Sequence, residues 1–481
     1  MATVSAAAPR DVLRWPLVGR FLRWPYARTS FQLLLLLVAA VLVLHGLFGP
    51  QVAPANLATV LSWVQYRGWL ILVLLAAGNF FCTACPFVLV RDAGRRLRPP
   101  SRKWPRWLRA KWIGIALFVA VLFIYELYDL WALPRATAWL VLSYFAVAFA
   151  IDLLFTGATF CKYICPIGQF SFVASTMSPL ELQVRQPDTC RTCRTVDCIK
   201  GRRDPSVPAR VLRRGCELSL FLPAKVGNLD CTFCLDCVHA CPHDNIAIAT
   251  RVPGLEIVDS RRRSGIGWLP RRRDMAVLAV VFVFGGLINA VGMTAPARDM
   301  EQGLVQLMGA RSEGPVLALL FAIVLVVIPL ALMSGAAALT AWITGLPSIV
   351  RIATGYAYAL IPLGCGVWLA HYGFHLLTGV LTVIPVVQSA VLDLVGWAAL
   401  GTPRWHLMGL RPGVVFPMEV GVILMGALGS LAMAYLISER DHPDRQVAAT
   451  IPWALVTAVV TVAALWITAQ PMDMRAVAFP G

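Results

Sequence analysis

Long apolar runs constrain this chain more than any other feature of its sequence. Clear examples cover residues 32–48, 275–293 and 316–333. Each is close to the ~20 residues that a helix needs to cross a hydrocarbon core of about 30 Å. A helix satisfies its own backbone hydrogen bonds inside a bilayer, so these runs predict membrane-spanning helices. Composition agrees, because only 14% of the 481 residues are charged, against about a quarter in soluble domains.

The apolar runs also predict the fold class. We expect a mainly α, polytopic helical membrane protein of about nine spans, with a small α+β domain inserted between two groups of helices. The predicted spans are 31–49, 68–88, 112–132, 137–160, 275–293, 315–335, 355–378, 415–438 and 451–470. The apolar stretch 381–400 is predicted to be re-entrant or surface-lying, because a tenth span would move the charged segment 439–445 outside.

The positive charges have a distribution that predicts topology. The formal net charge is +17, and the Arg and Lys residues cluster beside the apolar runs. Segment 91–111 alone carries nine Arg or Lys and one Asp. This is the positive-inside pattern of a bacterial inner membrane, so the N-terminus and this segment are predicted to be cytoplasmic. We therefore expect membrane lipid, and not nucleic acid, beside these basic segments.

Three parts follow from this pattern. Residues 1–180 form a first membrane block, and residues 274–481 form a second one of about five helices. Between them, residues 181–273 are rich in Arg, Asp, Pro and Cys, which predicts a small cytoplasmic domain.

The strongest motif is a run of four cysteines followed by proline. It reads Cys231-x2-Cys234-x2-Cys237-x3-Cys241-Pro242, which is the bacterial ferredoxin run. In that run, three cysteines bind one [4Fe–4S] cube and the fourth binds the other cube. A second cysteine set must therefore supply the remaining ligands.

That second set lies earlier in the same domain, as Cys190-x2-Cys193-x4-Cys198 and a separate Cys216. The simplest assignment crosses over between the two sets. One predicted cluster takes Cys190, Cys193, Cys198 and Cys241. The other takes Cys216, Cys231, Cys234 and Cys237. The second set departs from the standard run, because its spacing is longer, Glu217 replaces the proline and 17 residues precede Cys216.

Structural zinc and disulfides are the alternative uses of these cysteines. Paired C-x2-C motifs can bind zinc, but zinc does not require eight cysteines with this spacing. Disulfides are disfavoured on the reducing side of the membrane. Cys365 stands alone in an apolar run and is expected to be a small buried hydrophobe.

Two further Cys-Pro motifs are predicted at the cytoplasmic ends of membrane helices. Cys82 and Cys85 precede Pro86, and Cys161 and Cys165 precede Pro166. Four thiols at one membrane face can hold a third cluster or another metal, or can work as redox dithiols. The plain alternative is that they only shape the helix ends.

Together these motifs resemble the membrane-bound ferredoxins of the NapH/NosR type. The resemblance covers roughly residues 60–250, about 40% of the chain. It implies electron transfer between the quinone pool or soluble carriers and respiratory or photosynthetic acceptors. The second membrane block, which shorter NapH proteins lack, is similar to that of FesM-like proteins linked to cyclic electron flow.

The function expected from these features is that of an electron carrier or oxidoreductase subunit. Basic residues near the clusters would attract an acidic carrier such as a ferredoxin or flavodoxin, and a membrane redox complex is the other partner considered. A metal (copper) reductase or oxidase assembly factor is the alternative, with the Cys-Pro thiols as its working site. A transporter is disfavoured, because the spans show no repeated, broken substrate site.

The second block adds polar residues inside apolar spans. His371 and His375 share one helix face, and His45 is predicted at similar depth, so these histidines are candidates for quinone or haem b. Packing is the plain alternative. Four acidic residues are predicted within spans or at their ends: Glu126, Asp129, Asp152 and Glu419. They are candidates to carry quinol protons. The plain alternative is a buried pair with Arg67, Arg135 or a backbone group.

Overall fold

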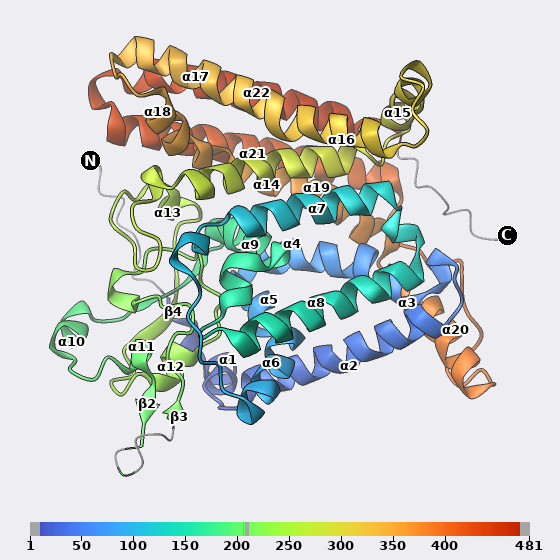
Figure 1. Ribbon diagram of the computed structural model, residues 1–481, viewed down its shortest axis with the longest axis horizontal. Coiled ribbons are helices and arrows are strands. Elements are labelled where there is room, and N and C mark those ends of the chain that lie inside the picture. The colour runs from blue at the N-terminus through green and yellow to red at the C-terminus, as the bar shows by residue number, and fades with distance from the viewer. Residues whose placement is uncertain (1–9, 205, 207–210, 472–481) are drawn as a thin grey trace. The chain divides into compact units, whose positions relative to one another are not determined.

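The computed structural model describes residues 10–204, 206 and 211–471 (Figure 1). The first nine residues of the segment predicted to be cytoplasmic lie outside this range. The chain divides into two compact units. Unit 1 comprises residues 1–37, 73–110 and 147–272, and unit 2 comprises residues 38–72, 111–146 and 273–481. The three-part division of the sequence stays a prediction.

Within the described residues, eight helices are long and apolar enough to cross a membrane. They are Ala27–Phe48, Leu57–Ala77, Pro134–Leu154, Arg273–Val291, Gly314–Thr344, Ile349–Gly379, Pro412–Asp441 and Pro443–Thr468. The chain is thus a multi-pass membrane protein, with eight candidate spans among the described residues against about nine expected. The expected span 112–132 is the 16-residue helix α7 (Trp112–Leu127), only about 24 Å long at 1.5 Å per residue.

The largest error of position concerns the second span. We expected it at 68–88, whereas it begins at Leu57 and ends at Ala77. Asn56, Thr59 and Gln65 made its first turns look polar, but their side chains hydrogen-bond to backbone groups. Gly78 ends the helix with a φ of +69°, a left-handed conformation that favours glycine.

Unit 1 combines short helices with two small antiparallel sheets. β1 (Leu180–Val184) pairs with β4 (Ile246–Thr250), and β2 (Arg202–Arg203) pairs with β3 (Val211–Arg213). Its helices are α1 (Pro16–Leu22), α5 (Phe80–Thr83), α6 (Pro86–Leu97), α9 (Pro166–Ala174), α10 (Pro187–Thr192), α11 (Asp197–Lys200), α12 (Asp236–Ala240) and α13 (Leu255–Val258), with short turns η1 (Val12–Arg14), η4 (Arg106–Leu108), η6 (Phe160–Ile164), η7 (Ser175–Met177), η8 (Leu222–Ala224) and η9 (Leu269–Arg271). The ferredoxin-like fold of this region stays a prediction.

The core of unit 1 is built around its cysteines. Val12 and Leu13 from the N-terminal segment pack with Phe233, Cys231 and Ile248 in one buried cluster. Arg10 and Thr250 exchange hydrogen bonds at the end of β4. The N-terminal segment is therefore an integral part of the cysteine-bearing region.

Unit 2 consists almost entirely of helices. They are α3 (Leu57–Thr59), α7, α14 (Arg273–Val291), α15 (Ala295–Leu307), α16 (Gly314–Ala322), α17 (Ile328–Thr344), α18 (Ile349–Tyr356), α19 (Ile361–Gly379), α20 (Val383–Val395), α21 (Pro412–Asp441) and α22 (Gln446–Thr468), with η2 (Ala53–Ala55), η3 (Val60–Tyr66), η5 (Leu130–Ala132), η10 (Ile323–Val327), η11 (Ala357–Leu360) and η12 (Pro443–Arg445). Helices α2 (Ala27–Phe48), α4 (Arg67–Ala77) and α8 (Pro134–Leu154) contribute residues to both units. Helices α14, α19, α21 and α22 pack against one another. Helix α20, in the stretch expected to be re-entrant or surface-lying, has 13 residues and is too short to cross a bilayer.

Candidate functional site

Four of the predicted cluster ligands line one cavity in unit 1. They are Cys216, Cys231, Cys234 and Cys237. Leucine side chains form much of the remaining wall, together with Lys225 and Thr232. Burial raises the pKa of Cys231 to about 11 and that of Cys237 well above its usual value. Such thiols keep their protons in water-poor surroundings unless a metal replaces the proton.

Asn245 connects two cysteines of the other predicted set. Its side-chain amide donates to the sulfur of Cys190, and its backbone N–H donates to the sulfur of Cys241, both at 3.4 Å. Burial, and next the neighbouring thiols beginning with Cys241, raise the pKa of Cys198 to about 11. Cys193 also lies near Cys198 and is more exposed than Cys198. Asn245 was not predicted as a site residue, although it follows the ferredoxin run by only four positions.

The thiols are spread more widely than the ligands of a single ion. In the described part of the chain, no three His, Cys, Asp or Glu side chains converge closely enough to hold one metal ion. All thirteen cysteines are free thiols. Cys365 is buried in α19, away from the other groups in sequence, as expected of a small hydrophobe.

Each Cys-Pro motif begins a helix. The predicted position of both motifs at the ends of long membrane helices is wrong, because α4 ends at Ala77 and α8 ends at Leu154. Cys85 and Cys165 are N-cap residues, and the prolines that follow them are the first residues of α6 and α9. Proline suits this position because its missing N–H would have no partner there. The sulfur of Cys165 also accepts a hydrogen bond from the backbone N–H of Gly168 at 3.2 Å.

The first Cys-Pro turn is bonded directly to the ferredoxin run. The Asn79 side chain donates to the carbonyl oxygen of Cys231 at 2.8 Å, and the Thr83 hydroxyl donates to that of Phe233 at 2.7 Å. Gly78 makes the close approach possible, since a Cβ there would lie 2.9 Å from the Phe233 ring. These bonds fix Cys82 beside the loop that carries Cys231.

The four Cys-Pro thiols influence one another electrostatically. Burial raises the pKa of Cys82 well above its usual value, and the neighbouring Cys85 and Cys165 raise it further. Burial likewise raises the pKa of Cys161, with Asp152 and then Cys165 and Cys85 among the further causes. Unit 1 therefore gathers these thiols into a third cysteine group.

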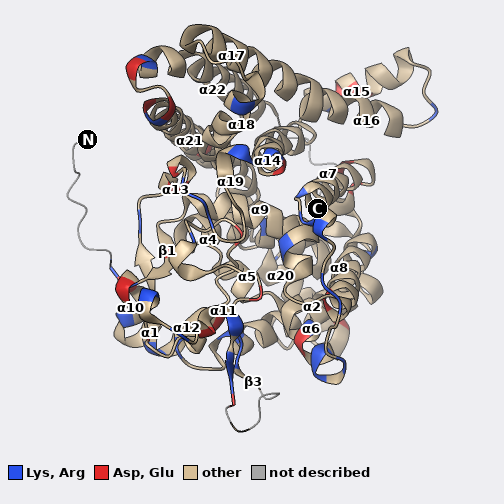
Figure 2. Ribbon diagram, turned by 60° about the vertical axis from the view of Figure 1, so that its left-hand side comes forward, with Lys and Arg blue, Asp and Glu red and all other residues tan. Residues whose placement is uncertain are grey.

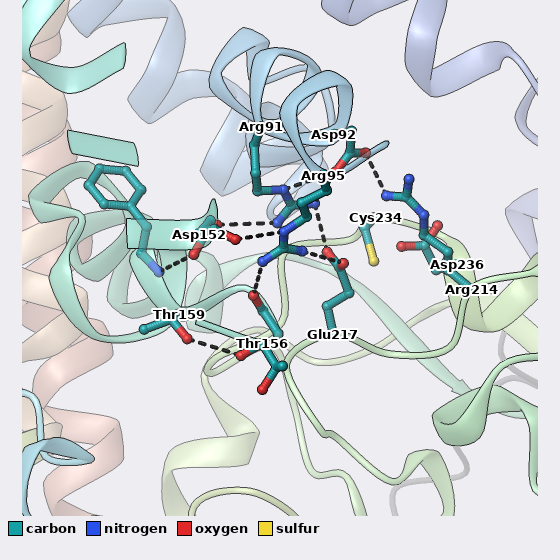
Figure 3. A network of polar contacts seen from close by, with 12 residues as sticks. Arg91, Asp92, Arg95, Asp152, Thr156, Thr159, Arg214, Glu217, Cys234 and Asp236 are labelled. Atoms are coloured by element: carbon teal, nitrogen blue, oxygen red, sulfur yellow. Dashed lines mark hydrogen bonds and ion pairs between the residues drawn. The ribbon is translucent and has the colours of Figure 1, made fainter. Parts of the chain in front are cut away.

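A network of charged side chains, with the buried Arg91 at its centre, lies close to Cys234 (Figure 3). Arg91 of α6 contacts Asp92 at 2.8 Å, Asp152 at 3.4 Å and Glu217 at 2.7 Å. Arg95, one turn later, contacts the other oxygen of Glu217 at 2.9 Å. Only 3% of the Arg91 side chain is exposed, so its guanidinium depends on these carboxylates for compensation.

This network explains one departure of the sequence from the ferredoxin run. Glu217 stands where the standard run has proline, and it joins the chain beside Cys216 to α6. Burial alone would raise the pKa of Glu217, but the Arg91 and Arg95 guanidinium groups outweigh it and lower that pKa. Asp152 was expected to pair with Arg67, Arg135 or the backbone. Its partners are Arg91 and the backbone N–H of Phe160.

A second arginine holds the ferredoxin run itself. Arg28 donates to both oxygens of Asp236 at 3.0 and 3.1 Å, and it lies 3.5 Å from the carbonyl oxygen of Cys234. Asp236 lies between Cys234 and Cys237 in the chain, so this contact orients the loop that carries both. Sequence reasoning missed Arg28 and Arg91, since nothing in the spacing of charges pairs residues so far apart.

The candidate histidines of unit 2 do not form one group. His45 accepts a hydrogen bond from the backbone N–H of Leu57 at 3.2 Å through Nδ1. His371 and His375 are neighbours on α19, with ring centroids 5.0 Å apart. Among the described residues, neither ring nitrogen of His371 has a hydrogen-bond partner. His371 lines a cavity together with Glu419.

The other acidic candidates and Arg67 have different surroundings. Glu126 accepts a hydrogen bond from Asn289 at 3.0 Å, and Asp129 follows the end of α7 with a positive φ. Arg67 packs against the faces of aromatic rings and donates to the Tyr125 hydroxyl at 3.1 Å.

Comparison with known proteins reveals distant relatives with related names. YccM of Escherichia coli (strain K12), whose name refers to electron transport, is 23% identical over 277 residues, covering 52% of this chain and 70% of YccM. The regulatory protein NosR of Pseudomonas aeruginosa is 26% identical over 187 residues, covering 34% of this chain and only 24% of NosR. The methylamine utilization ferredoxin-type protein MauN of Methylobacillus flagellatus is 26% identical over 214 residues, covering 41% of this chain and 72% of MauN.

No family model matches the chain, and no solved structure matches it significantly. The relatives nevertheless agree with the resemblance carried by the cysteine motifs. The chain is thus a distant homologue of YccM, NosR and MauN.

Proposed function

We propose that this chain is an electron-transfer protein of a bacterial inner membrane that binds two [4Fe–4S] clusters in unit 1. It passes electrons between a soluble carrier on the cytoplasmic side and a membrane partner, either the quinone pool or a redox complex. The observation that carries this proposal is the division of eight cysteines into two sets. One set lines a single cavity, and two members of the other share the donor Asn245.

The protein's own residues would hold and tune these clusters. A bound [4Fe–4S] cluster supplies one-electron transfer. The leucine-rich wall of the cavity keeps water from the set around Cys231, while hydrogen bonds to sulfur and nearby charges adjust the potential. Arg28 and Glu217 would act as positioning residues, because each connects a cysteine-bearing loop to a helix.

The surface around Cys190, Cys193 and Cys198 carries basic side chains that would attract an acidic partner. Exposed basic residues lie on α10, α11, the β2–β3 pair and the loop between α10 and α11 (Figure 2). They are Arg191, Arg194, Lys200, Arg202, Arg203 and Arg213. Opposite charge speeds the encounter of two proteins, and salt screens that attraction. We expect the rate of reduction by an acidic ferredoxin to fall as the salt concentration rises. The rate should also be lower in the Arg202→Gln variant, but not in the control variant Arg311→Gln, which alters an exposed residue of unit 2. A rate that is independent of salt would contradict the steering.

Metal analysis tests the proposal directly. Protein purified without oxygen should contain about eight iron and eight acid-labile sulfide per chain, and reduction should give electron paramagnetic resonance signals of [4Fe–4S] clusters. About twelve iron would add a cluster at the Cys-Pro thiols. A colourless, iron-free preparation that remains folded would refute the proposal.

A metal reductase or assembly factor is the second candidate function. The feature that favours it is the third cysteine group, in which Cys85 and Cys165 occupy the N-cap positions of α6 and α9. Stoichiometric copper bound by the chain, and lost on replacing Cys82 and Cys161, would support it. Copper binding that survives both replacements would exclude these thiols as the site.

A further inference from the structure

One side of the short helix α1 packs into the core of unit 1. Gly19 and Leu22 are its buried residues. Leu22 belongs to the buried cluster that also contains Cys231. A Cβ at Gly19 would clash with the backbone carbonyl of Leu13, so the helix lies directly against the turn that precedes it. This side of α1 is therefore joined to the cysteine-bearing core.

Another side of α1 is equally apolar but is exposed. Its residues Leu17, Val18 and Phe21 are 83%, 43% and 38% exposed. Leu17 is four positions and Val18 three positions before Phe21, so the three side chains share one face of the helix. Apolar side chains that gather on a surface mark a contact with lipid or with another molecule. The exposed face of α1 therefore suits an apolar partner.

Aromatic rings connect this face with the first turns of α2. The ring centres of Phe21 and Phe31 are 5.4 Å apart, and those of Trp24 and Tyr26 are 5.6 Å apart. Phe21 and Trp24 join the two pairs, with ring centres 6.2 Å apart. All four side chains are exposed. This aromatic cluster therefore makes one continuous apolar surface from α1 to α2.

The aromatic cluster continues into a surface that faces lipid. Leu33, Leu34 and Leu37 of α2 are 50%, 59% and 58% exposed, on a helix that is long and apolar enough to cross a membrane. Trp and Tyr are enriched where spanning helices leave the hydrocarbon core. Trp24 and Tyr26 come just before the first residue of α2, so the aromatic cluster marks the boundary between lipid and water.

Positive charge lies next to the exposed face of α1. Arg20 of α1 and Arg14 of η1 are exposed. The Arg14 side chain, 74% exposed, lies 3.6 Å from Asp11, which is a weak surface pair. Helices with an apolar face and exposed arginines lie in the head-group region of membranes, where anionic lipids attract the positive charges. The combination of apolar and basic side chains thus favours an anionic bilayer over a protein partner.

We propose that α1 and the aromatic cluster bind the membrane surface at which α2 enters the bilayer, with anionic phospholipids as the ligand. Leu17, Val18 and Phe21 insert at the level of the head groups. Arg14 and Arg20 donate hydrogen bonds to phosphate oxygens. The buried side of α1 then anchors the cysteine-bearing core to this surface. The inference goes beyond the proposed function, because lipid binding requires neither a cluster nor electron transfer.

The test is photocrosslinking of the full chain in lipid nanodiscs made of phosphatidylethanolamine and phosphatidylglycerol. Leu17→p-benzoylphenylalanine places a photoreactive ring at the most exposed apolar position of α1. The same replacement at Asp188, an exposed residue of α10 in unit 1, is the control. Mass spectrometry should find phospholipid adducts at position 17 at least about fivefold more often than at position 188, because only α1 lies among the head groups.

The contribution of charge is measured with the same photoreactive group at position 17. Replacing phosphatidylglycerol by phosphatidylcholine should lower the yield of lipid adducts about threefold or more, and so should Arg14→Gln combined with Arg20→Gln, because each arginine near an anionic surface contributes to binding. Arg191→Gln combined with Arg194→Gln removes the same charge from exposed positions elsewhere in unit 1. This control should leave the yield unchanged.

Folding of the variants is checked by gel filtration. Should the variant at position 17 misfold, Phe21→p-benzoylphenylalanine, which exchanges one exposed aromatic ring for another, decides the matter instead. A yield of lipid adducts no higher than at position 188 overturns the proposal, and so do adducts to a second copy of the chain in place of lipid. A yield that depends neither on phosphatidylglycerol nor on the two arginines overturns it as well.

Discussion

Unit 1 surrounds the buried Arg91 with carboxylates, whereas unit 2 buries Arg67 among aromatic rings. Arg91 contacts three acidic side chains. The Arg67 guanidinium carbon lies 4.8 to 5.2 Å from the ring centres of Tyr372, Tyr125 and Trp63. Directional ion pairs fix the loops that carry cysteines, while cation–π contacts let a charge remain inside a tightly packed helical unit.

This difference separates two tasks. In unit 1, Arg28 and Arg91 form ion pairs with carboxylates of the same unit, and these contacts hold the chain beside Cys216 and Cys234. Unit 2 leaves polar atoms of His371 without partners among the described residues. Variants that remove one kind of contact at a time should therefore have effects confined to one unit.

The largest effect is expected from removing a cluster ligand. Cys237→Ala removes one of the four cysteines that line a single cavity. One of the two proposed clusters should therefore be lost. Iron analysis should fall from about eight to about four atoms per chain. Cys365→Ala removes a buried thiol of unit 2 and should leave the iron content unchanged. An equal iron content in both variants would show that Cys237 is not a ligand.

The next largest effect should come from Arg91→Met. This variant leaves Asp152 and Glu217 without their shared guanidinium in a buried site, which typically costs about 3–5 kcal/mol. Hydrogen exchange followed by mass spectrometry should show faster opening of α6 and of the segment around Glu217. The control Arg96→Met, at an exposed position on the same helix, should change stability by about 0.5 kcal/mol at most. Equal exchange in both variants would argue against a stabilising network.

Sequence predicted the parts of this comparison better than their arrangement. Apolar length predicts spans, because helix formation in lipid depends on local composition. Cysteine spacing predicts the candidate cluster ligands, because the ferredoxin run is also a local sequence pattern. Neither contains long-range information, so the pairing of Arg28 with Asp236 and of Arg91 with Glu217 could not be foreseen. These partners are 208 and 126 residues apart.

Local exceptions also escaped prediction. The second span was misplaced because its polar first turn is satisfied by backbone partners and because one glycine ends it. The Cys-Pro motifs were read as helix ends, although proline at a first helical position is equally compatible with their sequence. The third expected span, 112–132, could not be recognised as a shorter helix by hydropathy alone, since α7 is apolar but has only 16 residues.

A smaller loss of stability is expected when a glycine with positive φ is replaced by alanine, and it should be larger at Gly78 in unit 1 than at Gly309 in unit 2. Gly78→Ala strains the backbone and also places a Cβ 2.9 Å from Phe233. Gly309→Ala, with a φ of +59°, strains the backbone but meets nothing within 4 Å. We expect losses of about 2–4 kcal/mol for the first and about 1–2 kcal/mol for the second. Thermal unfolding in detergent measures the loss of stability of both variants. Equal losses would mean that the Phe233 ring moves aside at little cost in free energy.

The smallest effect concerns packing within unit 2. Trp453 stacks on Tyr356 with ring centres 4.6 Å apart and planes inclined by 2°, and its Nε1–H donates to the Thr340 hydroxyl at 3.0 Å. Trp453→Phe keeps an aromatic ring but loses this donor and part of the stacked area, so unit 2 should lose about 1–2 kcal/mol of stability. Trp342→Phe, at a side chain that is 80% exposed, is the control and should lose almost nothing. Because Trp453, Tyr356 and Thr340 all belong to unit 2, the Trp453 variant should keep its full iron content while its melting temperature falls. A loss of iron from this variant would show that the two units do not respond independently.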